Sequence, residues 1–132
     1  MDFGLSVLIH LVFIAFFDSC WLALNFRFLR SGLIYPALSK SPPFHETVLC
    51  CVACWIMEAV YLAGHRQQTD LDSFYEGAWT GALVYVVFNF TELVTNSEWS
   101  FKPLVVDILW GTSLLAAASV LTTKIALGYY TN

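Results

Sequence analysis

The chain has 132 residues, of which 58% are hydrophobic and 12% are charged, with a formal net charge of -4. The charged share is about half of the ~25% usual in soluble domains, too little to form a polar shell around a single domain of this length. The Lys and Arg residues are scattered, which argues against a nucleic-acid surface, so we expect a protein embedded in lipid.

Four long apolar stretches follow one another along the chain. We predict transmembrane helices over residues 3–29, 44–64, 74–94 and 104–128, because about 20 residues at 1.5 Å each cross a hydrocarbon core of about 30 Å. Asp2 stands where a cleavable signal would carry positive charge, so we expect the first helix to remain in the mature protein. The sequence therefore predicts one all-α domain over residues 1–132, an integral membrane four-helix bundle with short loops.

An even number of spans places both termini on one side of the membrane. The loops over residues 25–43 and 95–103 then share the opposite side and carry more positive charge than the terminal side does, which predicts a matrix or cytoplasmic location for them. The positive residues of the loop side are Arg27, Arg30, Lys40 and Lys102, and those of the terminal side are Arg66 and Lys124. We expect the inner mitochondrial membrane in preference to a bacterial plasma membrane.

Acidic and amide side chains interrupt the predicted spans at matching depths. Asp18 lies about two thirds of the way along the first helix, and Asp107 lies near the start of the fourth, which runs in the opposite direction. Near the end of the third helix, Asn89 and Glu92 are three residues apart and share a helix face. A carboxylate in the bilayer is costly unless it is protonated, paired or hydrated, so we predict that these side chains meet in one leaflet. The predicted intramembrane polar cluster consists of Asp18, Asn89, Thr91, Glu92 and Asp107, with Trp21, Trp110 and Gly111 packed beside it.

Two interpretations of this polar cluster stay open. It could form a proton-accepting, cation-binding or headgroup pocket, or it could be a hydrogen-bonded clamp in which Asn89, Thr91 and Thr112 donate to the carboxylates. We favour the clamp, because most of these residues lie near a span end. Glu58 is a second buried carboxylate in the other half of the membrane, for which a structural and a functional role are equally plausible.

Other chemistry-bearing residues are predicted to serve packing. Cys50, Cys51 and Cys54 lack a second pair of ligands at zinc spacing, and we interpret them as small residues between helices. His10 has no partner at matching depth for haem. We therefore predict no metal and no cofactor. The spacing Gly77-x-x-x-Gly81 is typical of a close-packing helix face.

The polar segments resemble a known family. Asp18-x-x-Trp21-Leu22, the stretch over residues 88–93, Trp99 and the stretch over residues 105–112 are similar to the motifs of the predicted four-helix membrane family DUF2177. That family shows Asp-x-x-Trp-Leu in its first helix, Tyr-Asp-Leu-Thr-Asn-Leu followed by Trp-Pro after its third, and Val-Asp-x-x-Trp-Gly-Thr in its fourth. The resemblance implies the four-helix fold and no particular activity.

This chain departs from the family motifs in two places. Asn89 and Glu92 stand where the family has Asp and Asn, so acid and amide have exchanged places. The proline after Trp99 is delayed to Pro103. The exchange nearly preserves the composition of the pair, which suits a clamp better than a pocket that needs a carboxylate at one fixed point.

Three functions remain for such a chain. We expect a structural or accessory subunit of a larger membrane assembly, such as a respiratory-type energy-converting complex, that contacts lipids and other membrane subunits, binds no nucleic acid and is not an enzyme. The alternative is a small homodimeric transporter or proton-coupled carrier that uses the intramembrane carboxylates. A lipid-modifying enzyme comes last, since no acid cluster for a metal lies on a loop.

Overall fold

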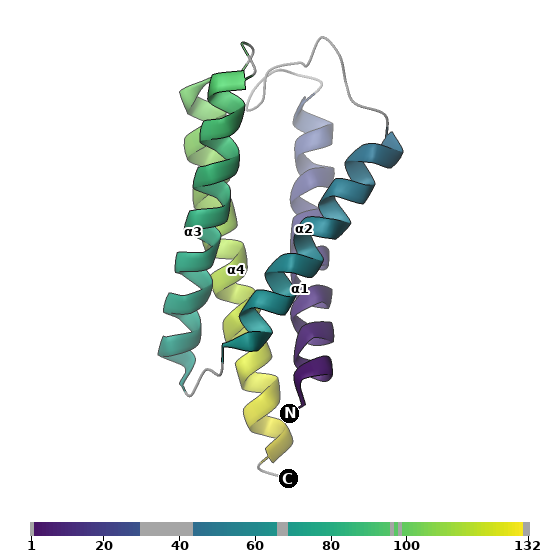
Figure 1. The fold of residues 1–132 in the computed structure, drawn as a ribbon, viewed down its shortest axis with the longest axis vertical. Coiled ribbons are helices and arrows are strands. Elements are labelled where there is room, and N and C mark those ends of the chain that lie inside the picture. Colours follow the sequence, from purple (N-terminus) through teal and green to yellow (C-terminus); the bar gives the residue numbers. More distant parts are fainter. Residues whose placement is uncertain (1, 30–43, 66–68, 96, 98, 131–132) are drawn as a thin grey trace.

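The computed structural model describes residues 2–29, 44–65, 69–95, 97 and 99–130, which fold into four helices (Figure 1). These are α1 (Phe3–Leu29), α2 (Phe44–Gly64), α3 (Asp70–Thr95) and α4 (Phe101–Tyr130). Successive helices run in opposite directions, and both termini lie at the same end of the bundle (Figure 1). Most of the residues between the helices, with Arg30, Lys40 and Arg66 among them, fall outside the described residues.

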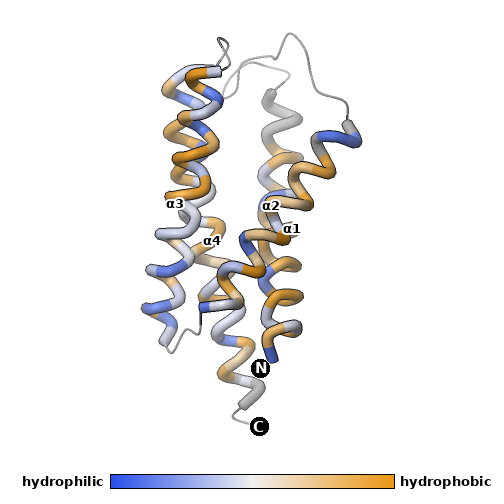
Figure 2. Tube along the Cα trace, in the orientation of Figure 1, coloured by the Kyte–Doolittle hydropathy of each residue, from blue (hydrophilic) through white to orange (hydrophobic). Residues whose placement is uncertain are grey.

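Three of the four described helices have the length and composition of membrane spans. Phe3–Leu24, Asp70–Thr95 and Phe101–Gly128 are each long and apolar enough to cross a bilayer, and α2 contributes the shorter apolar stretch Val48–Gly64. Hydrophobic residues cover most of α1 and α2, while hydrophilic ones gather at the beginning of α3 (Figure 2). The prediction of an all-α, four-helix membrane bundle is confirmed.

Two helices begin earlier than the predicted residues 74 and 104. At the start of α3, the Thr69 hydroxyl accepts the Asp72 N–H at 3.1 Å and donates to the Asp72 carboxylate at 2.8 Å. This reciprocal cap satisfies an otherwise unpaired N–H of the first turn and starts the helix at Asp70. In α4, Pro103 lies in the first turn, where its missing N–H costs no hydrogen bond.

The bundle consists of two antiparallel pairs. The contact between α3 and α4 is the most extensive, α1 packs against both α2 and α4, and α2 meets α3 only slightly. In the α3–α4 pair, a Cβ atom at Gly77 would overlap the Leu115 carbonyl, and one at Gly81 would overlap the Gly111 carbonyl. The glycine pair on α3 therefore brings two backbones together, as its spacing predicts.

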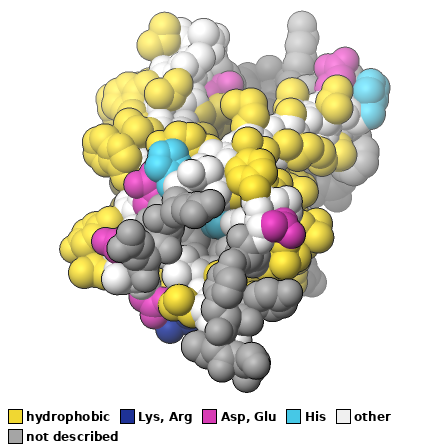
Figure 3. Space-filling view, turned by 60° about the horizontal axis from the view of Figure 1, so that its bottom comes forward, with side chains coloured by type: hydrophobic (Ala, Val, Ile, Leu, Met, Phe, Trp, Pro, Cys, Tyr) yellow, Lys and Arg dark blue, Asp and Glu magenta, His cyan; other side chains and the backbone are white. Residues whose placement is uncertain are grey.

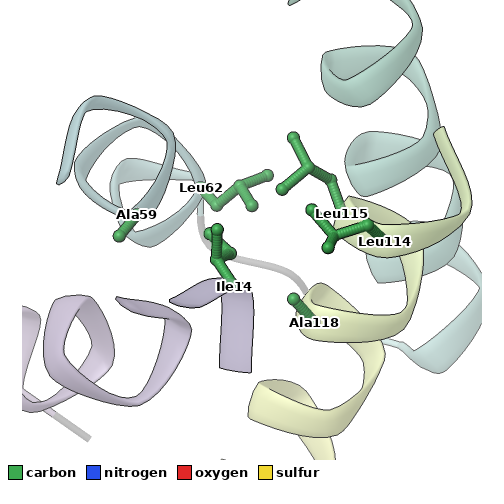
Figure 4. Close-up of a cluster of buried hydrophobic side chains, with 6 residues drawn as sticks. All are labelled: Ile14, Ala59, Leu62, Leu114, Leu115 and Ala118. Atoms are coloured by element: carbon green, nitrogen blue, oxygen red, sulfur yellow. The ribbon is translucent and has the colours of Figure 1, made fainter. Parts of the chain in front are cut away.

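A small apolar core joins the two pairs near the middle of the bundle. It is formed by one residue of α1, two of α2 and three of α4 (Figure 4), which are Ile14, Ala59, Leu62, Leu114, Leu115 and Ala118. Because α1 and α2 meet α4 in this core, the core fixes the positions of these three helices and of the polar side chains that they carry.

Candidate functional site

Asp18 is the centre of an indole–carboxylate cluster that links three helices. Trp55 of α2 donates its indole N–H to Asp18 Oδ2 at 2.8 Å, and Trp110 of α4 donates to Oδ1 at 3.2 Å. Asp18 is 9% exposed and follows His10 and Ile14 on the buried face of α1 at four-residue intervals. Both oxygens of the carboxylate are therefore engaged by donors from other helices. We use the name indole–carboxylate cluster for Asp18, Trp55 and Trp110.

A stacked tryptophan pair closes one side of this cluster. The rings of Trp21 and Trp110 lie with centroids 4.5 Å apart and planes 8° from parallel. Trp21 is three residues beyond Asp18 on α1, so the same helix face supplies both the acceptor and the stacking ring for Trp110. The stack fixes the position from which Trp110 donates, and it shields the carboxylate with apolar ring surface.

A second group, the amide–carboxylate cluster of Asn89, Asp107 and Trp99, joins α3 to α4. The Asn89 amide nitrogen donates to Asp107 Oδ2 at 2.7 Å and to the Tyr85 carbonyl at 2.9 Å. Its amide oxygen accepts the Trp99 indole N–H at 3.2 Å. Asn89 is fully buried and Asp107 is 7% exposed. All the hydrogen-bonding atoms of the Asn89 side chain are thus used within the bundle.

The structure distributes the predicted polar cluster over these two groups. Asn89 and Asp107 are in direct contact, whereas Asp18 is held by indoles. Thr91 lies on the exposed side of α3, where its hydroxyl donates to the Val87 carbonyl of its own helix at 2.7 Å. Glu92 is half-buried on the same helix.

The expected donation from threonine hydroxyls to the carboxylates does not occur. Thr112, like Thr91, donates to a carbonyl four residues earlier, that of Ile108, at 2.7 Å. A hydroxyl on a helix reaches this carbonyl without any tertiary contact, so the local bond forms in place of a bond to a carboxylate on another helix. Gly111 lies beneath the Tyr85 ring, where a Cβ atom would overlap the ring, so its role is close packing.

Trp55 and Trp99 are hydrogen-bond donors of the two clusters for which the sequence predicts no partner. Trp55 lies in the middle of α2 and follows Cys51 by four residues on the face toward α1. Trp99 precedes α4, and its ring meets Phe88 edge to face, with centroids 6.5 Å apart. A tryptophan in the middle of an apolar helix, away from the interfaces that this residue usually prefers, is the signal that identifies Trp55.

Glu58 occupies a different environment from the two aspartates. It is 6% exposed and lies three residues beyond Trp55 on α2. Among the described residues, its Oε2 atom has no hydrogen-bond partner. Because Trp55, one turn earlier on α2, donates to Asp18 of α1, Glu58 lies close to the α1–α2 contact.

The cysteines of α2 correct the expectation that they pack between helices. Cys50 and Cys54 are exposed, and Cys51 is half-buried. Within the described residues, no three His, Cys, Asp or Glu side chains come together as metal ligands would. The described contacts at the two clusters are hydrogen bonds from indole and amide donors to carboxylates.

At the terminal end of the bundle, polar contacts fasten the helix ends. Lys124 Nζ lies 2.8 Å from Asp70 Oδ2, and the hydroxyls of Ser73 and Thr123 are 2.6 Å apart. Both contacts link α3 to α4. The glycine-packed pair of α3 and α4 is thus joined by polar contacts at this end and by the Asn89–Asp107 hydrogen bond at the opposite end.

Comparison with known proteins extends the sequence resemblance. A family model described as Predicted membrane protein (DUF2177) matches residues 3–124. The matched region contains both the indole–carboxylate and the amide–carboxylate clusters, and it confirms the resemblance carried by their motifs. No curated protein and no solved structure matches the chain.

Proposed function

We propose that this chain, which belongs to the DUF2177 family of predicted membrane proteins, is a structural, accessory subunit of a larger membrane assembly of the energy-converting, respiratory type. The engagement of the aspartates within the bundle carries this proposal. Asp18 and Asp107 accept hydrogen bonds from side chains of other helices, so they act as a clamp. Interhelical hydrogen bonds in membranes are worth about 0.6–2 kcal/mol each, which suits fastening a small bundle.

The outer surface supports the same role. Large apolar side chains are exposed on every helix, among them Phe16, Met57, Trp79 and Leu109, and Trp79 is 62% exposed. Such a surface contacts lipids along the whole span, and broad aromatic area is also what helices of neighbouring subunits pack against. We include bound lipids between this chain and its neighbours in the proposal.

We further propose the inner mitochondrial membrane as the location, with the loops at residues 25–43 and 95–103 on the matrix side. The end of the bundle that carries the termini shows acidic side chains at several places among apolar ones (Figure 3). By sequence this end carries Arg66 and Lys124, against four Lys and Arg residues on the opposite side, and the positive-inside rule therefore favours the opposite end for the matrix. A C-terminal tag should then be cleaved by protease added to mitoplasts. A tag that survives this treatment would indicate the opposite orientation.

The subunit proposal is tested by gentle extraction. A photo-crosslinking residue is placed at Trp79, which is exposed, and at Leu115, which is fully buried, as the matched control. Membranes are irradiated before extraction in mild detergent, and the products are quantified by mass spectrometry. We expect Trp79 to capture the same membrane proteins reproducibly and at constant stoichiometry, and Leu115 to capture none. Isolation of the chain alone, with lipid adducts at Trp79, would contradict the proposal.

The carrier alternative has one observation in its favour, the Glu58 oxygen without a described partner. Two observations oppose it. The aspartates it would use are hydrogen-bonded within the bundle, and the Gly77–Gly81 face that could join a homodimer is occupied by α4.

A further inference from the structure

Glu58 is a buried carboxyl group that the clamp does not use. On α2, Trp55 lies three residues before Glu58 and donates to Asp18 of α1. Leu62 lies four residues after Glu58 and packs in the apolar core with residues of α4. Glu58 therefore shares the face of α2 that contacts these helices. Its Oε2 atom is buried and has no hydrogen-bond partner among the described residues. A buried ionised oxygen without a donor is strongly destabilising in an apolar environment, so Glu58 requires a ligand that neutralises it.

Asp18 is the acid that α1 brings to this contact, because it accepts the indole N–H of Trp55, which lies one turn before Glu58 on α2. Its two oxygens already accept indole N–H bonds, which suit an ionised carboxylate. Two thiols of α2, Cys54 and Cys51, lie one and two turns before Glu58, the first exposed and the second half-buried. Two carboxylates in one apolar contact cannot both be ionised without a large repulsion.

Several described cationic and titratable groups of the surrounding helices are engaged elsewhere, and Lys102 is exposed in the first turn of α4. On α1, the His10 ring nitrogen bonds to the Ser6 carbonyl at 2.9 Å. Lys124 of α4 pairs with Asp70, and His65 at the end of α2 lies 3.7 Å from Glu76 of α3. The other acid that α4 brings toward the centre, Asp107, accepts from Asn89.

We propose that the Asp18–Glu58 pair is a proton-binding site, with one proton carried on Glu58 and Asp18 ionised between its two indoles. A metal cation would need several oxygen ligands, and no three acidic, His or Cys side chains gather among the described residues. A proton needs one oxygen. Its uptake from the aqueous phase forms one O–H bond on Glu58 and changes the charge of the pair from -2 to -1. This inference does not rest on the subunit role.

Carboxyl-specific labelling tests the site. Dicyclohexylcarbodiimide dissolves in lipid and adds a protonated carboxyl across a C=N bond, and the adduct rearranges to an N-acylurea without a leaving group. The protein in liposomes is treated over a range of pH, and the modified peptides are quantified by mass spectrometry. We expect an adduct on Glu58 at neutral pH that declines as the pH rises, and its loss in Glu58→Gln. Glu46, exposed at the start of the same helix, is the matched control and should stay unmodified at neutral pH.

A second variant and a second measurement separate the site from a general effect. In Asp18→Asn the neighbouring charge is gone, so the pH at which labelling falls by half should shift downward. Infrared difference spectra of wild type against Glu58→Gln should contain the C=O stretch of a protonated carboxyl. Equal labelling of Glu58 and Glu46, labelling independent of pH, or the lack of both adduct and band overturns the proposal. A carboxyl band that persists in Glu58→Gln also overturns it, because the proton then belongs to another group.

Discussion

Trp110 stacks on Trp21 with planes 8° from parallel, and at the same time it donates its indole N–H to Asp18 on the same helix as Trp21. One side chain of α4 thus makes an apolar and a polar contact with a single face of α1. The two contacts fix both the distance and the rotation of α1 relative to α4.

Trp110→Phe separates the two contacts. The phenyl ring retains most of the stacking surface but removes the donor to Asp18 Oδ1, so we expect a loss of about 1–2 kcal/mol in the free energy of unfolding. The measurement is unfolding in mixed detergent micelles titrated with a denaturing detergent. Trp79→Phe, at an exposed position of α3, is the control and should have little effect. Equal stability of Trp110→Phe and wild type would mean that the indole bond contributes nothing.

Exchange of amide and acid tests the amide–carboxylate cluster. Asn89→Asp places a second carboxylate against Asp107 and should destabilise the bundle by about 2–3 kcal/mol. The double variant Asn89→Asp/Asp107→Asn restores one donor and one acceptor with their positions exchanged, and we expect it to recover most of that loss. A double-mutant cycle gives the coupling energy. Additive losses in the double variant would show that the pair does not act as a clamp.

Gly81→Ala probes the backbone contact between α3 and α4. The added Cβ would overlap the Gly111 carbonyl, and backbone cannot move aside as a side-chain tip can, so we expect a loss of at least about 2 kcal/mol. Gly64→Ala is the matched control, since nothing lies within 4 Å of a Cβ at that position. Thermal denaturation in detergent compares the two. A control variant that is destabilised as much as Gly81→Ala would refute the steric explanation.

Thr69→Ala removes the reciprocal cap of α3. It should cost about 1 kcal/mol and increase amide hydrogen exchange in the first turn of the helix, because the Asp72 N–H loses its acceptor. Thr91→Ala serves for comparison, since Thr91 is exposed and its hydroxyl donates to the Val87 carbonyl of the same helix. Unchanged exchange at Asp72 in Thr69→Ala would show that the cap is not what begins the helix.

Proteoliposome assays compare the subunit and carrier hypotheses. We expect the same proton leak from liposomes with wild-type protein, with Asp107→Asn and without protein, because Asp107 is committed to Asn89. A pH-sensitive dye inside the liposomes reports the leak. A flux that is specific to wild type and disappears in Asp107→Asn would support the carrier instead.

Hydropathy and helical periodicity suffice to predict the spans and the depth of their polar side chains. Asp107 and Trp110 share a face of α4 because they are three residues apart, and this follows from the sequence alone. The sequence also contains a signal for the start of α3 that the predicted start at residue 74 does not use, because Thr69-x-x-Asp72 before an apolar run is a helix-start signature.

The partners of each polar side chain could not be predicted in the same way. Hydropathy gives neither the order of the helices around the bundle nor their rotation. Whether Asp18 meets the donors of α3 or those of α2 and α4 depends on the order of the helices and on their rotation. The structure places α1 beside α2 and α4, so Trp55 and Trp110 reach Asp18, while Asn89 serves Asp107.

The two donors to Asp18 are separated from it by 37 and 92 residues along the chain. If insertion proceeds from the N-terminus, α1 and α2 enter the membrane before α4, and Asp18 then has Trp55 as its described partner until α4 arrives. Insertion of α4 then completes the environment of Asp18. A truncation before residue 101 would leave a partly satisfied carboxylate in lipid, which is the kind of defect that membrane quality control detects.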